Sequence, residues 1–101
     1  MKYLKHMLTV LLSLCATVAA AYNFKVDGIC YNITDAINKT VEVTKNGYYY
    51  AYSDKYTGSV VIPGSVTYSG NTYSVTSIGA SAFEDCSDLT SIEIPNSVTI
   101  I

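Results

Sequence analysis

The sequence predicts a β-rich cap of antiparallel hairpins that leads into a solenoid of stacked repeats. Each coil of this solenoid is expected to carry one short strand and one helical turn. Two recurrences predict the repeats, because a period of twenty-odd residues is typical of stacked units. Val60-x-Ile62-Pro63-x-Ser65-Val66-Thr67 recurs 32 residues later as Ile92-x-Ile94-Pro95-x-Ser97-Val98-Thr99. Ser74-Val75-Thr76 with Ile78 recurs 23 residues later as Ser97-Val98-Thr99 with Ile101.

Residues 1–21 have the pattern of a secretory signal peptide. Lys2 and Lys5 form a basic start, an apolar run follows from Met7 to Val18, and three alanines precede Tyr22. This run is shorter than the roughly 20 apolar residues that a helix needs to span a bilayer. We therefore expect cleavage of the signal, export to the medium or the cell surface, and no membrane span in the mature chain.

The charge and composition of the mature chain exclude several classes of function. Four lysines and no arginine stand against eight acids, which leaves a net charge of about −4 and no basic cluster. Nucleic acid is therefore not an expected partner, because phosphate binding needs a concentrated positive face. The only histidine, His6, leaves with the signal, so the mature chain lacks the commonest general base and metal ligand. We expect no enzyme, no cofactor and no metal site.

Residues 22–58 are predicted to form the β-hairpin cap. Asp27-Gly28, Asn46-Gly47 and Gly70-Asn71 each separate two β-prone runs, which is a strong hairpin signal. The second of these hairpins would pair residues 40–44 with 48–52, and the third would pair 65–68 with 73–75. Up to about Tyr73, the chain is thus predicted to be a meander of short antiparallel strands.

Residues 59–101 are predicted to hold a degenerate first coil, which contains the third hairpin, then one full repeat and the start of another. Ala82, Phe83 and Cys86 are spaced for a short helical turn with one buried side. Ile92 and Ile94 alternate with polar residues as in a half-buried strand, which Pro95 ends. The expected repeat core is Ile78, Ala82, Phe83, Cys86, Leu89, Ile92, Ile94 and Val98. A helix over residues 80–89 in an ordinary α+β domain would explain the spacing, but not the recurrences.

The repeat resembles the BspA-type leucine-rich-repeat family. The residues that carry the resemblance are Ile78-Gly79, Ala82-Phe83, Cys86, Leu89, Ile92, Ile94-Pro95 and Ser97-Val98-Thr99. This resemblance implies a leucine-rich-repeat solenoid in a secreted or surface-displayed protein that binds other macromolecules and is not an enzyme. Because relatives carry many repeats, the chain looks like a fragment, and further repeats of the same chain are expected downstream.

The leading expectation for function is adhesion or macromolecular binding through the stacked coils, with a protein or glycan as ligand. One alternative is a structural cap that starts a longer solenoid. Another is a carbohydrate-binding β module in which Tyr48, Tyr50 and Tyr52 form the ligand platform, since aromatic rings stack on sugars. The simpler interpretation of these tyrosines is that they cover a thin core. Cys86 is expected to act as a small buried hydrophobe, and whether Cys30 pairs with Cys86 stays open.

Overall fold

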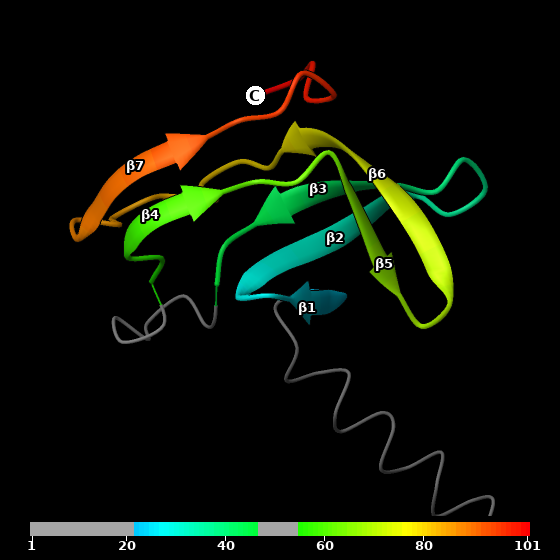
Figure 1. The fold of residues 1–101 in the computed structure, drawn as a ribbon, viewed down its shortest axis with the longest axis horizontal. Helices are drawn as coiled ribbons and strands as arrows, with labels where there is room; N and C mark the ends of the chain where they lie inside the picture. Colours follow the sequence, from blue (N-terminus) through cyan, green and yellow to red (C-terminus); the bar gives the residue numbers. More distant parts are fainter. Residues whose placement is uncertain (1–21, 47–54) are drawn as a thin grey trace, which may run out of the picture.

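The computed structural model describes residues 22–46 and 55–101, which fold into two sheets with no helix among them (Figure 1). The larger sheet has the strand order β1-β2-β3-β6-β5, and the smaller one pairs β4 with β7. The strands are β1 (Phe24–Val26), β2 (Ile29–Asp35), β3 (Thr40–Thr44), β4 (Gly58–Val61), β5 (Ser65–Tyr68), β6 (Asn71–Ile78) and β7 (Leu89–Glu93).

Two of the predicted hairpins are confirmed. β1 and β2 pair antiparallel around Asp27 and Gly28, whose φ angles are 50° and 82°. Two-residue hairpin loops of this kind need positive φ at both central residues, and glycine adopts it without steric cost. β5 and β6 also pair antiparallel, but their turn is Ser69-Gly70, one residue earlier than predicted.

The antiparallel meander predicted for this region is wrong at β3. This strand forms as expected, but residues 48–52, its predicted hairpin partner, lie outside the described residues. β3 pairs antiparallel with β2 on one side and parallel with β6 on the other, with Val41 opposite Val75. Local turn signals reveal only neighbours in sequence, whereas a parallel pair needs a long crossover connection.

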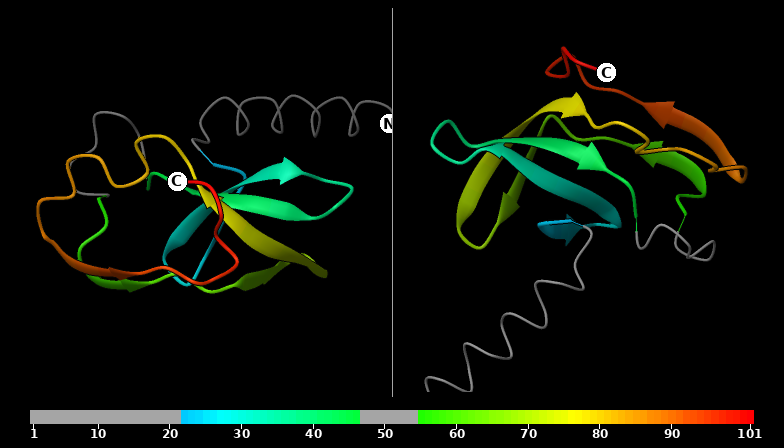
Figure 2. Two further views of the ribbon diagram at one scale, coloured as in Figure 1. Left: turned by 90° about the horizontal axis from the view of Figure 1, so that it is seen from above. Right: turned by 180° about the vertical axis from the view of Figure 1, so that it is seen from behind.

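The two recurrences mark strands that stack on each other. β4 and β7 pair in parallel with Val60 opposite Ile92, which is the 32-residue offset. In the second column of strands, Ser77 bridges Ile100 in parallel and the Thr99 N–H donates to the Thr76 carbonyl at 3.0 Å, which is the 23-residue offset. The chain thus winds between two columns of parallel strands, β4-β7 and β3-β6 with residues 99–100 (Figure 2).

The helical turn predicted for each coil is wrong. The segment from Gly79 to Asp88, which crosses between the columns, is a series of turns. Ser81 and Asp85 have φ angles of 62° and 58°, in the left-handed region that a right-handed helix cannot contain. The amide groups of Ala82, Glu84, Cys86 and Leu89 each donate to the carbonyl three residues earlier, at 3.1–3.3 Å. Successive turns therefore reproduce the apolar spacing that suggested a helix.

The core fills the space between the two sheets. Tyr31, Val41, Val43 and Val75 from the larger sheet are almost wholly inaccessible to solvent, and Val60 and Ile62 from the β4 side face them. The larger sheet curls until its edge strands, β1 and β5, contact each other. The result is a nearly closed sheet at the N-terminal side, with the β4-β7 column attached to it.

Candidate functional site

The predicted repeat-core residues occupy three kinds of position. Ile78 and Ala82 are buried in the core, and five more pack against it while partly exposed: Phe83, Cys86, Leu89, Ile92 and Val98. Ile94 is 42% exposed, because it follows the end of β7, where no described strand covers it. Ile100 and Ile101 are exposed at the same end of the columns.

Within the repeat motif, Gly79 contacts β3 through its backbone and lies close to the Glu42 side chain. Its N–H donates to the Val43 carbonyl at 2.8 Å, which holds the segment against β3. A Cβ atom placed on Gly79 would lie 3.0 Å from Cδ of Glu42, so the Glu42 carboxylate would have to shift by a few tenths of an ångström. The Ile78-Gly79 pair is thus the point at which the crossing segment leaves the sheet.

The predicted tyrosine platform, Tyr48, Tyr50 and Tyr52, lies outside the described residues. Tyr56, which follows it, is buried and has a structural role. Its hydroxyl accepts the Cys30 N–H at 2.9 Å and donates to the Thr44 carbonyl at 2.7 Å, joining β2 to the end of β3. Burial raises the pKa of Tyr56 above its usual range, so the phenol stays protonated and can donate.

The thiols and acids of the described residues form no evident reactive centre. Cys30 and Cys86 are not disulfide-bonded to each other, and Cys30 Sγ lies 3.4 Å from Asn46 Oδ1. Cys86 is half-buried against the core. Within residues 22–46 and 55–101, no group of three or more histidine, cysteine or acidic side chains is placed to hold a metal ion. The same residues contain no helix that could cross a membrane.

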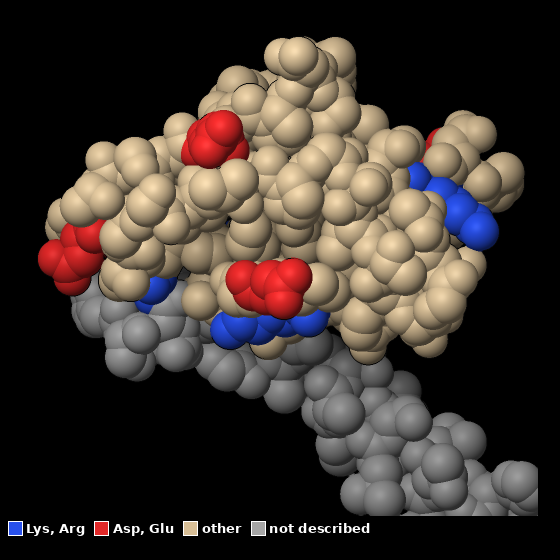
Figure 3. All heavy atoms as spheres, viewed as in Figure 1, with Lys and Arg blue, Asp and Glu red and all other residues tan. Residues whose placement is uncertain are grey.

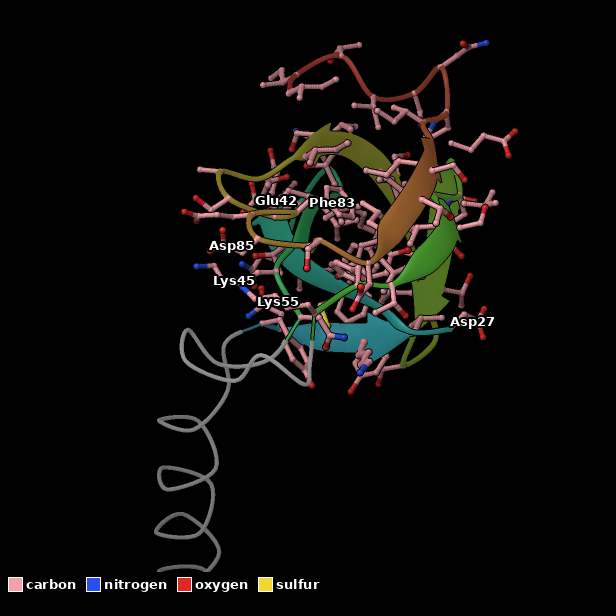
Figure 4. The ribbon with its side chains drawn as sticks, turned by 90° about the vertical axis from the view of Figure 1, so that its left-hand side faces the viewer. Asp27, Glu42, Lys45, Lys55, Phe83 and Asp85 are labelled. Carbon is pink, nitrogen blue, oxygen red and sulfur yellow. The ribbon has the colours of Figure 1, made fainter. Side chains whose placement is uncertain are left out.

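Charged side chains are dispersed over the surface. Figure 3 shows acidic and basic groups interspersed on one face, with no concentrated patch of either sign. In Figure 4, Glu42, Lys45, Lys55 and Asp85 lie on one side of the molecule and Asp27 lies on the other. Lys55 Nζ donates to the Glu84 carbonyl at 3.3 Å, which joins the chain before β4 to the crossing segment.

Two adjoining hollows run along β4 and β5. The first, of about 310 Å³, lies between β4 and the β1-β2 turn and extends to Asn46 and Lys55. The second, of about 420 Å³, lies between the β1 end and the chain from Val61 to Thr67. Both are lined by Asp27, Ile29 and Val61, so they form one groove that passes the β1-β2 turn. We call this the β4-β5 groove.

The second hollow contains an unusual polar group. Tyr31 lines it and is only 1% exposed, and its hydroxyl forms no hydrogen bond with any described residue. Among the described residues, every fully buried side-chain N or O atom has a hydrogen-bond partner. Because the Tyr31 hydroxyl has none, it is not fully buried, and the small exposed area of Tyr31 includes it. Burial, reinforced by the nearby Asp27 charge, raises the pKa of Tyr31 to about 12. The sequence alternation placed Tyr31 in a strand, but gave no sign that it would meet β5.

Parallel strands that stack at the offset of a sequence recurrence are typical of repeat proteins. In agreement, the chain is similar to a leucine-rich repeat protein from Bacteroides ovatus ATCC 8483 whose crystal structure is known, with 40% identity and a TM-score of 0.63. The match covers 76% of this chain and 18% of that protein, so the chain spans less than a fifth of its length. This similarity supports a leucine-rich-repeat-like family.

Other comparisons are negative. No protein-family model matches the chain, and no curated protein matches it.

Proposed function

We propose that this chain is part of a secreted or cell-surface leucine-rich-repeat protein of the BspA type, which binds protein or glycan ligands in adhesion and catalyses no reaction. The observation that carries this proposal is the stacking of β4 on β7 at the offset of the recurring phrase, with Val60 opposite Ile92. Repeat solenoids of this kind present extended binding surfaces rather than enclosed reaction sites. The similarity to the Bacteroides protein supports the repeat-protein part of the proposal.

Adhesion can be tested with beads that carry the purified chain, incubated with panels of immobilised proteins and glycans. The matched control is Val60→Asp, which places a charge in the core and should unfold the stacked strands. We expect the chain to be retained on at least one ligand and the control to lose that binding. The proposal would be contradicted if no immobilised protein or glycan retained the chain and an antibody against the chain stained only the cytoplasm of the producing cell.

A second candidate function is an N-terminal cap for a longer solenoid. The β1-β2 hairpin lies beyond β3 at one end of the β3-β6 column, whereas Ile94, Ile100 and Ile101 are exposed. Terminal repeats differ from internal ones because they must seal the core. Appending one or two copies of residues 79–101 should then raise the melting temperature stepwise. An unchanged melting temperature would show that the open end needs no further coil.

A further inference from the structure

We propose that the β4-β5 groove binds an extended peptide that adds to the open edge of β4 and places a basic side chain beside Asp27. This inference goes beyond the proposed function, because it assigns a site that the stacked coils do not form. The groove lies on the opposite edge of β4 from β7. The adhesion proposal and this one can therefore fail separately.

The backbone of β4 offers unpaired hydrogen-bonding groups to the groove. The Gly58 N–H donates to the Asp88 carbonyl and the Ile62 N–H to the Glu93 carbonyl, both at 2.9 Å and both toward β7. Because these groups alternate in direction along a strand, the N–H and C=O groups of Ser59 and Val61 point to the other edge. Among residues 22–46 and 55–101, no strand pairs with that edge. An open edge of this kind accepts an extended peptide by strand addition.

The second hollow provides a place for a side chain of such a peptide. Its walls are largely aliphatic, with Val26, Ile29 and Val66 among them, and its volume of about 420 Å³ lies within the range of small-molecule sites. Tyr31 lines this hollow, and its hydroxyl bonds to no described residue. Because this hydroxyl has no partner among the described residues, it can form a hydrogen bond with an occupant that carries a polar group.

The charge of the second hollow selects the sign of the side chain that enters it, since Lys55 lines only the first hollow. Asp27 lines both hollows, and the second hollow has no basic side chain in its lining. A lysine or arginine of the peptide would be attracted to this carboxylate, while its aliphatic stem would contact the apolar walls. An acidic side chain at the same position would be repelled by Asp27.

The test is a titration of the ¹⁵N-labelled chain with a capped pentapeptide that has threonine at each end and a lysine between two valines. We expect the amide signals of Ser59 and Val61 to shift and their hydrogen exchange to slow. The matched peptide with glutamate in place of lysine should bind at least about tenfold more weakly. Asp27→Asn should abolish this preference for lysine over glutamate. A lysine peptide N-methylated on alternate backbone amides should lose binding, because strand addition requires main-chain hydrogen bonds.

Tyr31→Phe completes the test on the protein side, because it removes one oxygen and leaves the aromatic stack with Phe24 in place. It should weaken lysine-peptide binding several-fold without changing the fold, as judged by the remaining amide spectrum. The proposal is overturned if the peptides cause no change at Ser59 and Val61 at millimolar concentration. It is also overturned if the glutamate peptide binds as well as the lysine peptide, or if N-methylation has no effect.

Discussion

The rings of Phe24 and Tyr68 stack with their centroids 4.5 Å apart and their planes only 5° from parallel. Their strands, β1 and β5, are the two edges of the five-stranded sheet, so this stack closes the sheet on itself. Phe24 is buried and also contacts Tyr31 and Tyr73, which links the stack to the core. The two ends of the sheet are thus joined by side chains, with no strand pairing between them.

Replacing Tyr68 by alanine should remove the contact that joins the edge strands β1 and β5. We expect Tyr68→Ala to lower the free energy of unfolding by about 1–3 kcal/mol, from the lost stack and the exposure of Phe24. Tyr68→Phe is the matched control, since it keeps the ring, and it should be close to neutral. Urea denaturation of both variants provides the measurement. Equal stability of Tyr68→Ala and the unchanged chain would show that the sheet does not depend on this contact.

Tyr56 should be much less tolerant of losing its hydroxyl than Tyr68. In Tyr56→Phe the Cys30 N–H and the Thr44 carbonyl both lose a buried partner. Each unsatisfied buried group costs about 1–3 kcal/mol, so for the two groups we expect a loss of about 2–6 kcal/mol. Equilibrium denaturation of Tyr56→Phe and Tyr68→Phe compares two variants that each lose one phenolic oxygen. Similar small losses in both would mean that the Tyr56 hydroxyl does not join β2 to β3.

The conformation of Asp85 distinguishes the observed turns from the predicted helical turn. Because its φ of 58° is left-handed, Asp85→Gly should raise the free energy of unfolding by about 0.5–1 kcal/mol, whereas Asp85→Ala should lower it. In a helix the order is reversed, because glycine is about 1 kcal/mol worse than alanine there. The sign of the difference between the two variants, measured in urea, decides between a turn and a helix at this residue.

Alkaline pH should destabilise the fold through its buried tyrosines. The raised pKa values of Tyr31, about 12 against 10.0, and of Tyr56 mean that the folded state holds the phenol protons more tightly than the unfolded state. The resulting stability is present below pH 10 and is lost as the pH rises from 10 toward 12. Tyr31→Phe should flatten this decline, which denaturant midpoints across the pH range would measure. An equally steep decline in Tyr31→Phe would show that Tyr31 ionises as easily in the folded state as in the unfolded one.

The sequence was most informative where a local signal and a repeat coincide. Asp27-Gly28 predicted the first hairpin because a tight turn needs residues that tolerate positive φ. The 32-residue recurrence predicted which segments correspond, and the structure pairs Val60 with Ile92. The hairpin depends on a few residues that are close in sequence, and the strand stacking depends on a motif that recurs, so both can be recognised without the structure.

The sequence could not predict the features that depend on the backbone or on distant contacts. Ser81 and Asp85 adopt left-handed conformations without the glycine that would have signalled them, so the sequence predicts a short helical turn there instead. The parallel pairing of β3 with β6 joins segments far apart in sequence. The groove beside Tyr31 likewise forms only when the β1-β2 turn meets the chain from Val61 to Thr67.

The central claim is that the recurring phrases lie side by side as parallel strands, and a disulfide between them tests it most directly. The Ser91 hydroxyl donates to the Ser59 hydroxyl at 2.9 Å, and these residues face each other in the β4-β7 pair. With Cys86 replaced by alanine, Ser59→Cys combined with Ser91→Cys should therefore form a cross-link under mild oxidation. Ser59→Cys combined with Glu93→Cys is displaced by two residues, beyond the reach of a disulfide, and should stay reduced. Equal yields, or a cross-link only in the displaced pair, would contradict the stacked-repeat account.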